Sequence, residues 1–425
     1  MKKTVSALTA LVLFAGVAAG CGNNATNQSS TSSANGNEEQ VTLKYWMYQT
    51  DPFINANKKL IADYEKAHPN VKIDIESFPW DDYVQKIQAA YIGNEAPDIA
   101  QVFGSWVPAL SKAGLLAEVP NKDKYDAELY PAALGAYELN GKLYGVPGEF
   151  NLENGGILVN TKLYKEASDP TTWDQLMATA KKLTVYENDA PKIFGFDFYG
   201  DSVTFLFLSL ILQQGGKYWT DDNMVDFNTP EAAKALQTVV DIKTKEKIAD
   251  LSRTTYSYED TFKGDTAMTF VGPWVNALGK DYQTTDFKYI KMPSFTGTSD
   301  AFAAESGWGE IVSESSEHKD VALDFLQFIT NEENSRYWNA TSSTIPAYKA
   351  VAEDPEYLSQ NPALKPSLED LKNGTWIGPI ENRDFFFKQI YDNYEKAVKV
   401  GAPVDLVLKD AQQAINDMLT KERSK

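Results

Sequence analysis

Residues 41–103 alternate between two apolar periodicities, and this pattern constrains the fold more than any other feature of the sequence. Apolar residues recur at every second position in VTLKYW and VKIDIES, and PDIAQVF is a short apolar run, so each segment is a predicted strand. Helical spacing between them predicts one helix from Asp51 to His68 and a second that ends at Gly93. This order predicts an α/β fold with a parallel sheet and right-handed crossovers.

The predicted sheet also indicates where a ligand would bind. In parallel sheets, ligands lie in the crevice beyond the carboxyl ends of the strands. The loops at these ends are YWMYQTD, SFPWDD and FGSWVP, and each of them contains a tryptophan. We therefore expect an aromatic binding surface at this edge.

The rest of the chain continues the mixture of strands and helices. Residues 139–150 are typical of a turn and a short strand, and 155–160 of a further strand. A helix is predicted after a cap at Thr171 or Thr172, and another in VTFLFLSLILQQGG, which is too short to span a membrane. The remaining predicted helices cover 230–248, 319–330 and the C-terminus.

The first forty residues predict export and anchoring. Lys2 and Lys3 precede an uncharged apolar run of fifteen residues, which is typical of a secretory signal peptide, predicted here as 1–20. Ala18-Ala19-Gly20-Cys21 resembles the lipobox of bacterial lipoproteins, so lipidation is predicted at Cys21. The alternative is an ordinary signal peptide with an incidental cysteine.

The segment after Cys21 indicates a tether. It contains no large apolar side chain up to residue 40, and such a segment cannot bury enough surface to fold. We expect a domain on the extracellular face of the cytoplasmic membrane, held by lipid alone and on a Gram-positive cell. Cys21 is the sole cysteine, so it forms no internal disulfide.

Charge excludes some classes of partner. Without Lys2 and Lys3 the chain carries 59 acidic and 38 basic residues, a formal net charge of −21. Nucleic-acid binding requires clustered basic residues, so no nucleic-acid partner is expected, and anionic ligands are disfavoured. The aromatic content of 12% supplies flat amphipathic surface instead.

The sequence predicts no cofactor, no metal and no catalytic residue. His68 and His318 are the only histidines and lie far apart, so they form neither a metal cluster nor a catalytic triad. No phosphate-binding glycine motif occurs. Paired carboxylates are expected by chance among 59 acidic residues, so a glycosidase remains an alternative.

Several motifs in sequence order resemble one family. They are GNEAPDIAQVF, LSKAGLLAEV, NGKLYGVP, ILVNTKLYKEA, PTTWDQLMATAKKL, FKGDTAMTFVGPWV, GWGEIVSESSEHKDVALDFLQFITNEENSRYW and IPAYKAV. Together they are similar to the extracellular solute-binding proteins of ABC sugar importers, the maltose-binding-protein-like family 1. The resemblance implies two α/β lobes, a hinge and an interlobe ligand cleft. It places the N-terminal lobe at 41–150 plus about 300–345, and the C-terminal lobe at 151–299 plus about 346–425.

The same resemblance implies ligand-binding residues. Trp274 aligns with a tryptophan that stacks on sugar in the family, and Trp308 with an aromatic position that faces the cleft. Ser105 and Trp106 stand where the maltose binder uses a charged pair, which implies a different sugar held by stacking. For the tryptophans, the alternative role is packing in the core.

Other implied contacts are polar or lie at the hinge. Asp51 matches a position that accepts sugar hydroxyls, although Asp is also a good helix N-cap. A hinge glutamate corresponds to Glu153, with Glu149 or Asn151 as substitutes. Trp80 lies on the loop after the second predicted strand, where ligand contact and packing at the sheet edge are equally expected roles. The further implied contacts, from the second lobe, are Arg383 and Phe385.

The sequence therefore predicts a monomeric receptor that binds a sugar, favouring an oligosaccharide, and delivers it to ABC permease subunits by hinge closure. Two alternatives remain open. One is an extracellular carbohydrate-active lipoprotein enzyme. The other is a binding protein for a peptide, a polyamine or another small polar solute.

Overall fold

The computed structural model describes residues 40–151, 156–188 and 190–424. The predicted signal peptide, Cys21 and the tether up to Glu39 lie outside them. The α-helices are α1 (Asp51–Ala67), α2 (Trp80–Ile92), α3 (Val107–Lys112), α4 (Lys122–Glu128), α5 (Pro131–Leu134), α6 (Trp173–Leu183), α7 (Asp201–Gln213), α8 (Pro230–Thr244), α9 (Ser257–Lys263), α10 (Lys319–Ile329), α11 (Glu332–Ser342), α12 (Lys349–Ala352), α13 (Pro355–Gln360), α14 (Lys365–Leu368), α15 (Arg383–Val400) and α16 (Val404–Arg423).

The strands are short and numerous. They are β1 (Val41–Tyr48), β2 (Val71–Phe78), β3 (Ile99–Phe103), β4 (Glu138–Leu139), β5 (Lys142–Leu143), β6 (Val146–Pro147), β7 (Phe150–Asn151), β8 (Gly156–Asn160), β9 (Val185–Glu187), β10 (Ala190–Ile193), β11 (Met268–Phe270), β12 (Phe287–Lys291), β13 (Phe302–Ser306), β14 (Trp308–Val312) and β15 (Gly374–Trp376). Two 3₁₀ helices matter for the site, η1 (Gly104–Trp106) and η3 (Pro273–Lys280).

The predicted parallel sheet is present and is larger than expected. Its strand order is β2-β1-β3-β14-β6, and β1 pairs in parallel with both β2 and β3. The sequence pattern did not reveal β14, and it predicted a short strand within 139–150, where β6 lies, without placing it in this sheet; both strands extend the sheet in antiparallel pairing. The central strands are buried on both faces, as a sheet covered by helices requires.

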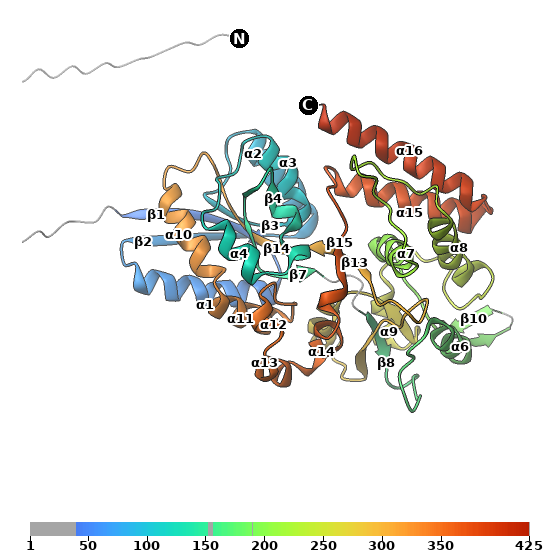
Figure 1. Cartoon of the computed structure of the whole chain (residues 1–425). Helices are drawn as coiled ribbons and strands as arrows, with labels where there is room; N and C mark the ends of the chain where they lie inside the picture. Colours follow the sequence, from blue (N-terminus) through green and yellow to red (C-terminus); the bar gives the residue numbers. More distant parts are fainter. Residues whose placement is uncertain (1–39, 152–155, 189, 425) are drawn as a thin grey trace, which may run out of the picture. The chain divides into compact units, whose positions relative to one another are not determined.

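Alternation along β1 distributes helices over the two faces of this sheet. Tyr45 points toward α1 and α10, where its hydroxyl accepts a hydrogen bond from Asn57 and its ring meets Phe325. Trp46 points to the opposite face, where Lys86 of α2 lies over its indole ring. Figure 1 shows α1 and α2 on opposite sides of the sheet.

The strands β1, β2 and β3 end side by side in aromatic residues. Tyr48 pairs with Phe78 at the last position of the β1–β2 register, and β3 ends at Phe103. The prediction of a tryptophan in the first loop is wrong. Trp46 lies within β1, because the strand continues to Tyr48, so it does not belong to the loop at the sheet edge.

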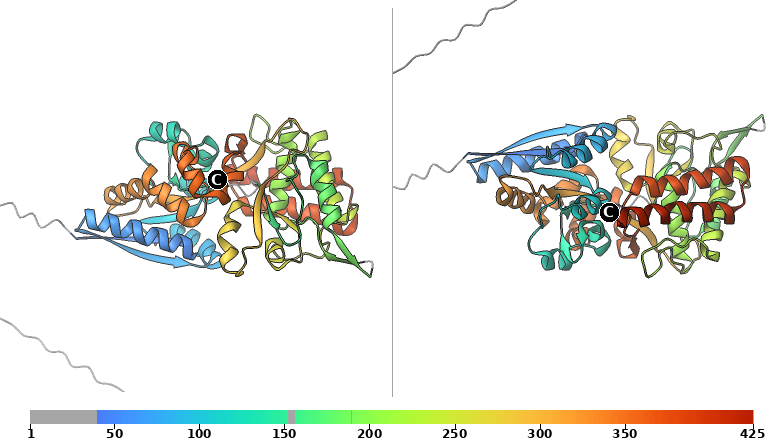
Figure 2. Two further views of the ribbon diagram at one scale, coloured as in Figure 1. Left: turned by 90° about the horizontal axis from the view of Figure 1, so that it is seen from below. Right: turned by 90° about the horizontal axis from the view of Figure 1, so that it is seen from above.

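A second apolar core surrounds the antiparallel sheet β11-β8-β12. Helix α7 contributes buried residues on nearly every side, which explains its uninterrupted apolar sequence. The helices α15 and α16 pack side by side against this core (Figure 2). The predicted cap of α6 is confirmed at Thr172, whose hydroxyl accepts a hydrogen bond from the backbone N–H of Gln175.

Strand β13 lies between the two cores. Within this strand, Phe302 and Ala304 pack in the first core, whereas Ala303 between them packs in the second, as alternation along a strand requires. The chain passes from β13 through Gly307 directly into β14 of the first sheet. The lobe boundaries expected from the sequence stay a prediction.

In the part of the chain that the structure describes, no helix is both long enough and apolar enough to cross a membrane.

Candidate functional site

A cleft of about 470 Å³ opens beyond the carboxyl ends of the first sheet. This volume falls within the range of about 300–1,000 Å³ that is usual for small-molecule sites. The lining residues are Tyr48, Thr50, Pro52, Phe53, Trp80, Phe103, Glu149, Phe150, Asn151, Asp201, Tyr256, Tyr258, Pro273, Trp274, Ala277, Leu278, Trp308, Ser342, Thr344, Ile345 and Arg383. Six of the residues expected from the sequence are among them: Trp80, Glu149, Asn151, Trp274, Trp308 and Arg383.

One wall of the cleft is an interlocked group of aromatic rings, here called the sheet-edge wall: Tyr48, Phe53, Trp80, Phe103 and Trp308. Tyr48 stacks on Trp308 with ring centroids 5.0 Å apart and planes 4° apart. Trp308 is consequently only 7% exposed, whereas Trp80 at the start of α2 is 40% exposed. Trp80 therefore offers more ring surface to a ligand than any other tryptophan of this wall.

Two expected contact residues stand behind this wall. Trp106 is buried, and its ring lies 5.6 Å from that of Trp80 at an angle of 39°, so it supports Trp80 and does not line the cleft. Ser105 is also not among the lining residues, and its buried hydroxyl has no hydrogen-bond partner in the part of the chain that the structure describes. Both residues belong to η1, which turns the chain away from the cleft directly after β3.

The opposite side, here called the loop wall, consists of Tyr256, Tyr258 and Trp274. Trp274 lies in the first turn of η3, and its ring meets Tyr258 edge-on at a centroid distance of 5.3 Å. Tyr258 lies in α9, and Tyr256 immediately precedes this helix. The ion pairs that Arg253 forms with Asp197 and Asp260 connect this helix to the second core.

The floor between the walls is polar. The Glu149 carboxylate accepts a hydrogen bond from the backbone N–H of Trp308 at 3.1 Å. Gly307 makes this approach possible, because a Cβ at that position would lie 2.4 Å from Cγ of Glu149. Asn151 is 6% exposed, and its side-chain Nδ2 has no hydrogen-bond partner among the described residues. Such a buried donor is costly unless a ligand oxygen accepts from it.

Arg383 contributes a cation whose charge is already neutralised by two carboxylates, those of Glu305 and Asp201. Its guanidinium donates to Glu305 at 2.6 and 2.9 Å and lies 2.8 Å from the carboxylate of Asp201. Burial lowers the pKa of Arg383, but the two carboxylates outweigh it and hold that pKa above its usual value. Burial likewise raises the pKa of Glu305 against the opposing effect of Arg383. Among the cleft-lining residues that the structure describes, Arg383 is the only basic one.

Two further expected residues, Asp51 and Phe385, do not line the cleft. Asp51 is exposed and is the first residue of α1; the N-cap alternative is wrong, because Thr50 occupies that position. Phe385 packs against the second core, and Phe387 contacts Arg383 instead, at 3.9 Å. Glu153 lies outside the described residues.

Sequence reasoning missed most of the loop wall. The segment TTYSYED has neither strand nor helix periodicity, although its two tyrosines among polar residues were a detectable signal. Asp201 was missed because it begins a helix that is otherwise apolar. Thr50 and Thr344 are short polar residues at element ends, and no pattern distinguishes them.

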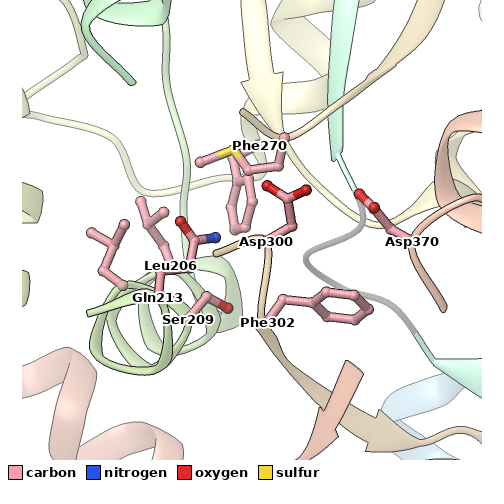
Figure 3. A pocket seen from close by; sticks show the side chains of 9 residues that line it. Leu206, Ser209, Gln213, Phe270, Asp300, Phe302 and Asp370 are labelled. Carbon is pink, nitrogen blue, oxygen red and sulfur yellow. The ribbon is translucent and has the colours of Figure 1, made fainter. Parts of the chain in front are cut away.

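A much smaller cavity, of about 10 Å³, lies beside α7 (Figure 3). Asp300 and Asp370 approach it from two segments, and Lys291 pairs with them at 2.9 and 2.7 Å. A space of this size holds about one water molecule, so this cavity is a structural junction. No group of three potential metal-ligating residues occurs among the described residues.

The cleft and the two cores belong to a known architecture. Residues 59–366 match the family of bacterial extracellular solute-binding proteins. The chain belongs to this family. Membership implies that this solute-binding protein acts in an extracellular or periplasmic location.

Similar proteins extend the match over most of the chain. An uncharacterized ABC transporter extracellular-binding protein of Pyrococcus horikoshii is 23% identical over 384 residues, which cover 87% of this chain and 90% of that relative. An arabinooligosaccharide-binding protein of Bacillus subtilis is 24% identical over 366 residues, covering 80% and 79%.

Solved structures confirm the predicted two-lobe α/β fold of this solute-binding protein. A cyclic alpha-maltosyl-1,6-maltose binding protein of Arthrobacter globiformis is 27% identical with a TM-score of 0.75, covering 89% of this chain and 99% of that chain. An ABC substrate-binding protein of Listeria monocytogenes in complex with cycloalternan is 22% identical with a TM-score of 0.76, covering 90% and 100%.

Proposed function

We propose that this solute-binding protein is an oligosaccharide receptor that delivers its ligand to an ABC importer. The observation that carries the proposal is the composition of the cleft. Aromatic walls face each other across a floor that contains the matched Arg383, the carboxylate of Glu149 and the unsatisfied amide of Asn151.

This composition fits the two kinds of surface on a sugar. C–H groups on the ring faces bind to aromatic rings, and hydroxyls bind to carboxylates, amides and guanidinium groups. Covering about 100 Å² of apolar surface contributes roughly 2.5 kcal/mol. Each hydrogen bond adds about 1 kcal/mol, and more where the protein group is charged. Contact with both walls and several hydrogen bonds would reach the 8.2 kcal/mol of about micromolar binding.

The relatives support the ligand class. The names of the Bacillus subtilis and Arthrobacter globiformis proteins state oligosaccharide ligands, and the second of these proteins is 27% identical to this chain. The matched charge of Arg383 favours a neutral ligand, because an anion would have to compete with Asp201 and Glu305. A neutral oligosaccharide meets both conditions.

Closure about a hinge is part of the proposal. The separate hydrophobic clusters on either side of β13 support a division into two lobes, with β13 as one crossing. A ligand that contacts both walls binds the closed form better and so shifts the population toward it. We propose that the permease recognises this closed form of a monomeric receptor, without any catalysis by the chain.

The proposal also includes a lipid anchor at Cys21 on a Gram-positive cell surface. It rests on the sequence alone, because Cys21 lies outside the described residues. Mass spectrometry of the membrane fraction tests it: the expected product begins at a diacylglyceryl-modified Cys21. Cys21→Ser should release the protein into the medium, and a Cys21→Ser chain that stayed attached to the membrane would contradict the anchor.

Intrinsic fluorescence titration with saccharides tests the receptor function. The chain from residue 21 onward, carrying Cys21→Ser, is titrated with arabino-oligosaccharides, malto-oligosaccharides and a cyclic tetrasaccharide, and with a polyamine and a peptide. We expect a saturable change with one saccharide class and a loss of about 30-fold or more in affinity for Trp80→Ala or Trp274→Ala.

The matched control is Tyr186→Ala, which removes an exposed tyrosine from β9, outside the cleft lining. It should leave saccharide affinity unchanged. A response to the polyamine or peptide alone would overturn the oligosaccharide assignment. Chromatography after prolonged incubation provides a second check, because shortened saccharide products would identify an enzyme.

A further inference from the structure

The aromatic rings of the loop wall do not end at the cleft. Trp274, Tyr258 and Tyr256 line it, and the ring of Tyr256 meets that of Tyr199 at a centroid distance of 5.9 Å. Tyr199 in turn meets Tyr391 at 5.7 Å. The rings therefore continue as a row beyond the cleft lining, here called the outer row: Tyr256, Tyr199 and Tyr391.

Local structure holds the outer row against the cleft. Gly200 has a φ of 61°, a conformation that glycine adopts without strain, and this turn separates Tyr199 from the cleft-lining Asp201. Tyr391 lies eight residues after Arg383 on α15, about 12 Å further along the helix from the cleft. The middle of the row, Tyr199, and its outer end, Tyr391, are thus fixed to elements that also supply cleft residues.

The surface properties of the row suit a ligand and not only packing. Tyr256 is 52% exposed, and Tyr199 and Tyr391 are partly exposed. The contact of Tyr199 with each neighbour is edge-on, with interplanar angles of 84° and 75°. Edge-on contacts orient neighbouring rings in different directions, so the three rings of the row do not share one plane.

The charges beside the row balance each other. Glu395 and Lys399 of α15 form an ion pair, with Glu395 in electrostatic reach of Tyr391 and Lys399 in reach of Tyr199. Neutral, amphipathic surface of this kind matches an uncharged saccharide in the same way as the cleft does.

We propose that the outer row is an additional saccharide-binding subsite, which holds the units of a linear oligosaccharide that extend out of the cleft. This inference rests on the proposed receptor function and adds chain length to its ligand specificity. It predicts that a linear hexasaccharide binds more tightly than the disaccharide of the same series.

The test compares the lengths of linear saccharides in calorimetric titrations of the protein from residue 21 onward, carrying Cys21→Ser. The probes are the linear disaccharide and hexasaccharide of the malto- and arabino- series, together with a cyclic tetrasaccharide. The double variant Tyr199→Ala/Tyr391→Ala should bind the hexasaccharide about tenfold more weakly and the disaccharide as the unmodified chain does. The cyclic probe has no free chain end, so its affinity should not change.

The controls separate this inference from a structural effect and from the receptor function. Tyr186→Ala, at an exposed tyrosine of β9, should change neither affinity. If the double variant lost affinity equally for both linear probes, the row would act by supporting the cleft and the subsite would be refuted. Equal affinity of the unmodified chain for the two lengths would also refute it, with the receptor function intact. If none of the saccharides bound, the receptor function itself would fail.

Discussion

The two walls of the cleft use the same aromatic chemistry but are held in place differently. The sheet-edge wall follows directly from strands of the large sheet, and its rings support one another through stacked and edge-on contacts. The loop wall lies on α9 and η3 over a much smaller apolar cluster, with five buried members. Its connection to the second core includes the buried ion pairs of Arg253.

This difference concerns what positions a binding surface. Packed rings at strand ends are fixed by the same burial that stabilises the sheet. Their position therefore depends on many small van der Waals contacts, and no single contact dominates. A wall connected by a buried ion pair depends on a few charged atoms, and removing one partner leaves the other unmatched. We therefore expect the two walls to respond differently to single substitutions.

The largest expected effect is at Arg253. Its side chain and that of Asp197 are almost fully buried, with Nε 2.5 Å from Oδ2, and Asp260 of α9 lies 2.8 Å from Nη1. Arg253→Ala leaves the buried Asp197 carboxylate with the more distant Lys243, at 3.8 Å, and with hydrogen bonds from the backbone N–H groups of Phe198 and Asp250. We expect the free energy of unfolding to fall by about 3–5 kcal/mol, as measured by chemical denaturation.

The control lies on α9, the helix that carries Asp260. Lys263 pairs with Glu259 at the surface of α9, where about half of the lysine side chain is exposed. Lys263→Ala should change the free energy of unfolding by less than about 0.5 kcal/mol. Similar losses for Arg253→Ala and Lys263→Ala would contradict the view that the buried ion pairs hold the loop wall.

The next effect concerns a carboxyl group behind the sheet-edge wall. Glu310 follows Trp308 by two residues in β14, is fully enclosed, and accepts hydrogen bonds from Tyr45 and Gln101. Burial raises the pKa of Glu310 to about 7, and the two hydrogen bonds oppose the rise. The neighbouring Tyr45, Tyr83 and Tyr137 have pKa values raised by burial, so they stay protonated near neutral pH.

The sign of the pH dependence follows from the raised pKa. The folded state favours the neutral carboxyl group, so its contribution is fully present below the unfolded pKa of about 4.5 and is lost as the pH rises through about 7. In the unmodified chain, ionisation of Glu310 lowers the free energy of unfolding as the pH rises. We expect Glu310→Gln to abolish this decrease, which amounts to up to about 3 kcal/mol. Denaturation at pH 5 and pH 8 measures it, and an equal pH dependence in the variant and the unmodified chain would contradict it.

The sequence was sufficient for the parts of the site that regular elements position. Alternation predicted β1 and β2, and a short apolar run predicted β3, so the aromatic residues at their ends were expected at one edge, and the structure places Trp80 there. The resemblance to the family added Trp274, Trp308, Glu149 and Arg383, which also line the cleft. Their contact with a ligand stays a prediction.

The rest depended on turns that have no periodic pattern. The 3₁₀ turn of η1 sends Trp106 behind Trp80, and nothing in FGSWVP distinguishes this direction from one into the cleft. Tyr256 and Tyr258 come from a segment without periodicity, where Arg253 determines the position through contacts distant in sequence. Likewise β14 reaches the first sheet only after the chain has passed through the second core, and β6 joins the sheet by pairing with β14.

The smallest expected effect is at Asn151, on the floor where the two walls meet. Its buried Nδ2 has no partner in the described part of the chain, so the unliganded protein already bears the desolvation cost of this donor. A saccharide oxygen that accepts from Nδ2 would recover about 1 kcal/mol on binding, so Asn151→Ala should weaken saccharide affinity about fivefold to tenfold in calorimetric titration. The Asn151→Ala variant loses no satisfied donor. Its free energy of unfolding without ligand should therefore fall by less than that of Arg253→Ala. The affinity loss should be equal for linear and cyclic saccharides, because the floor contacts units held within the cleft. Unchanged affinity for every saccharide that binds would show that the floor is not part of the contact surface and that the two walls act alone.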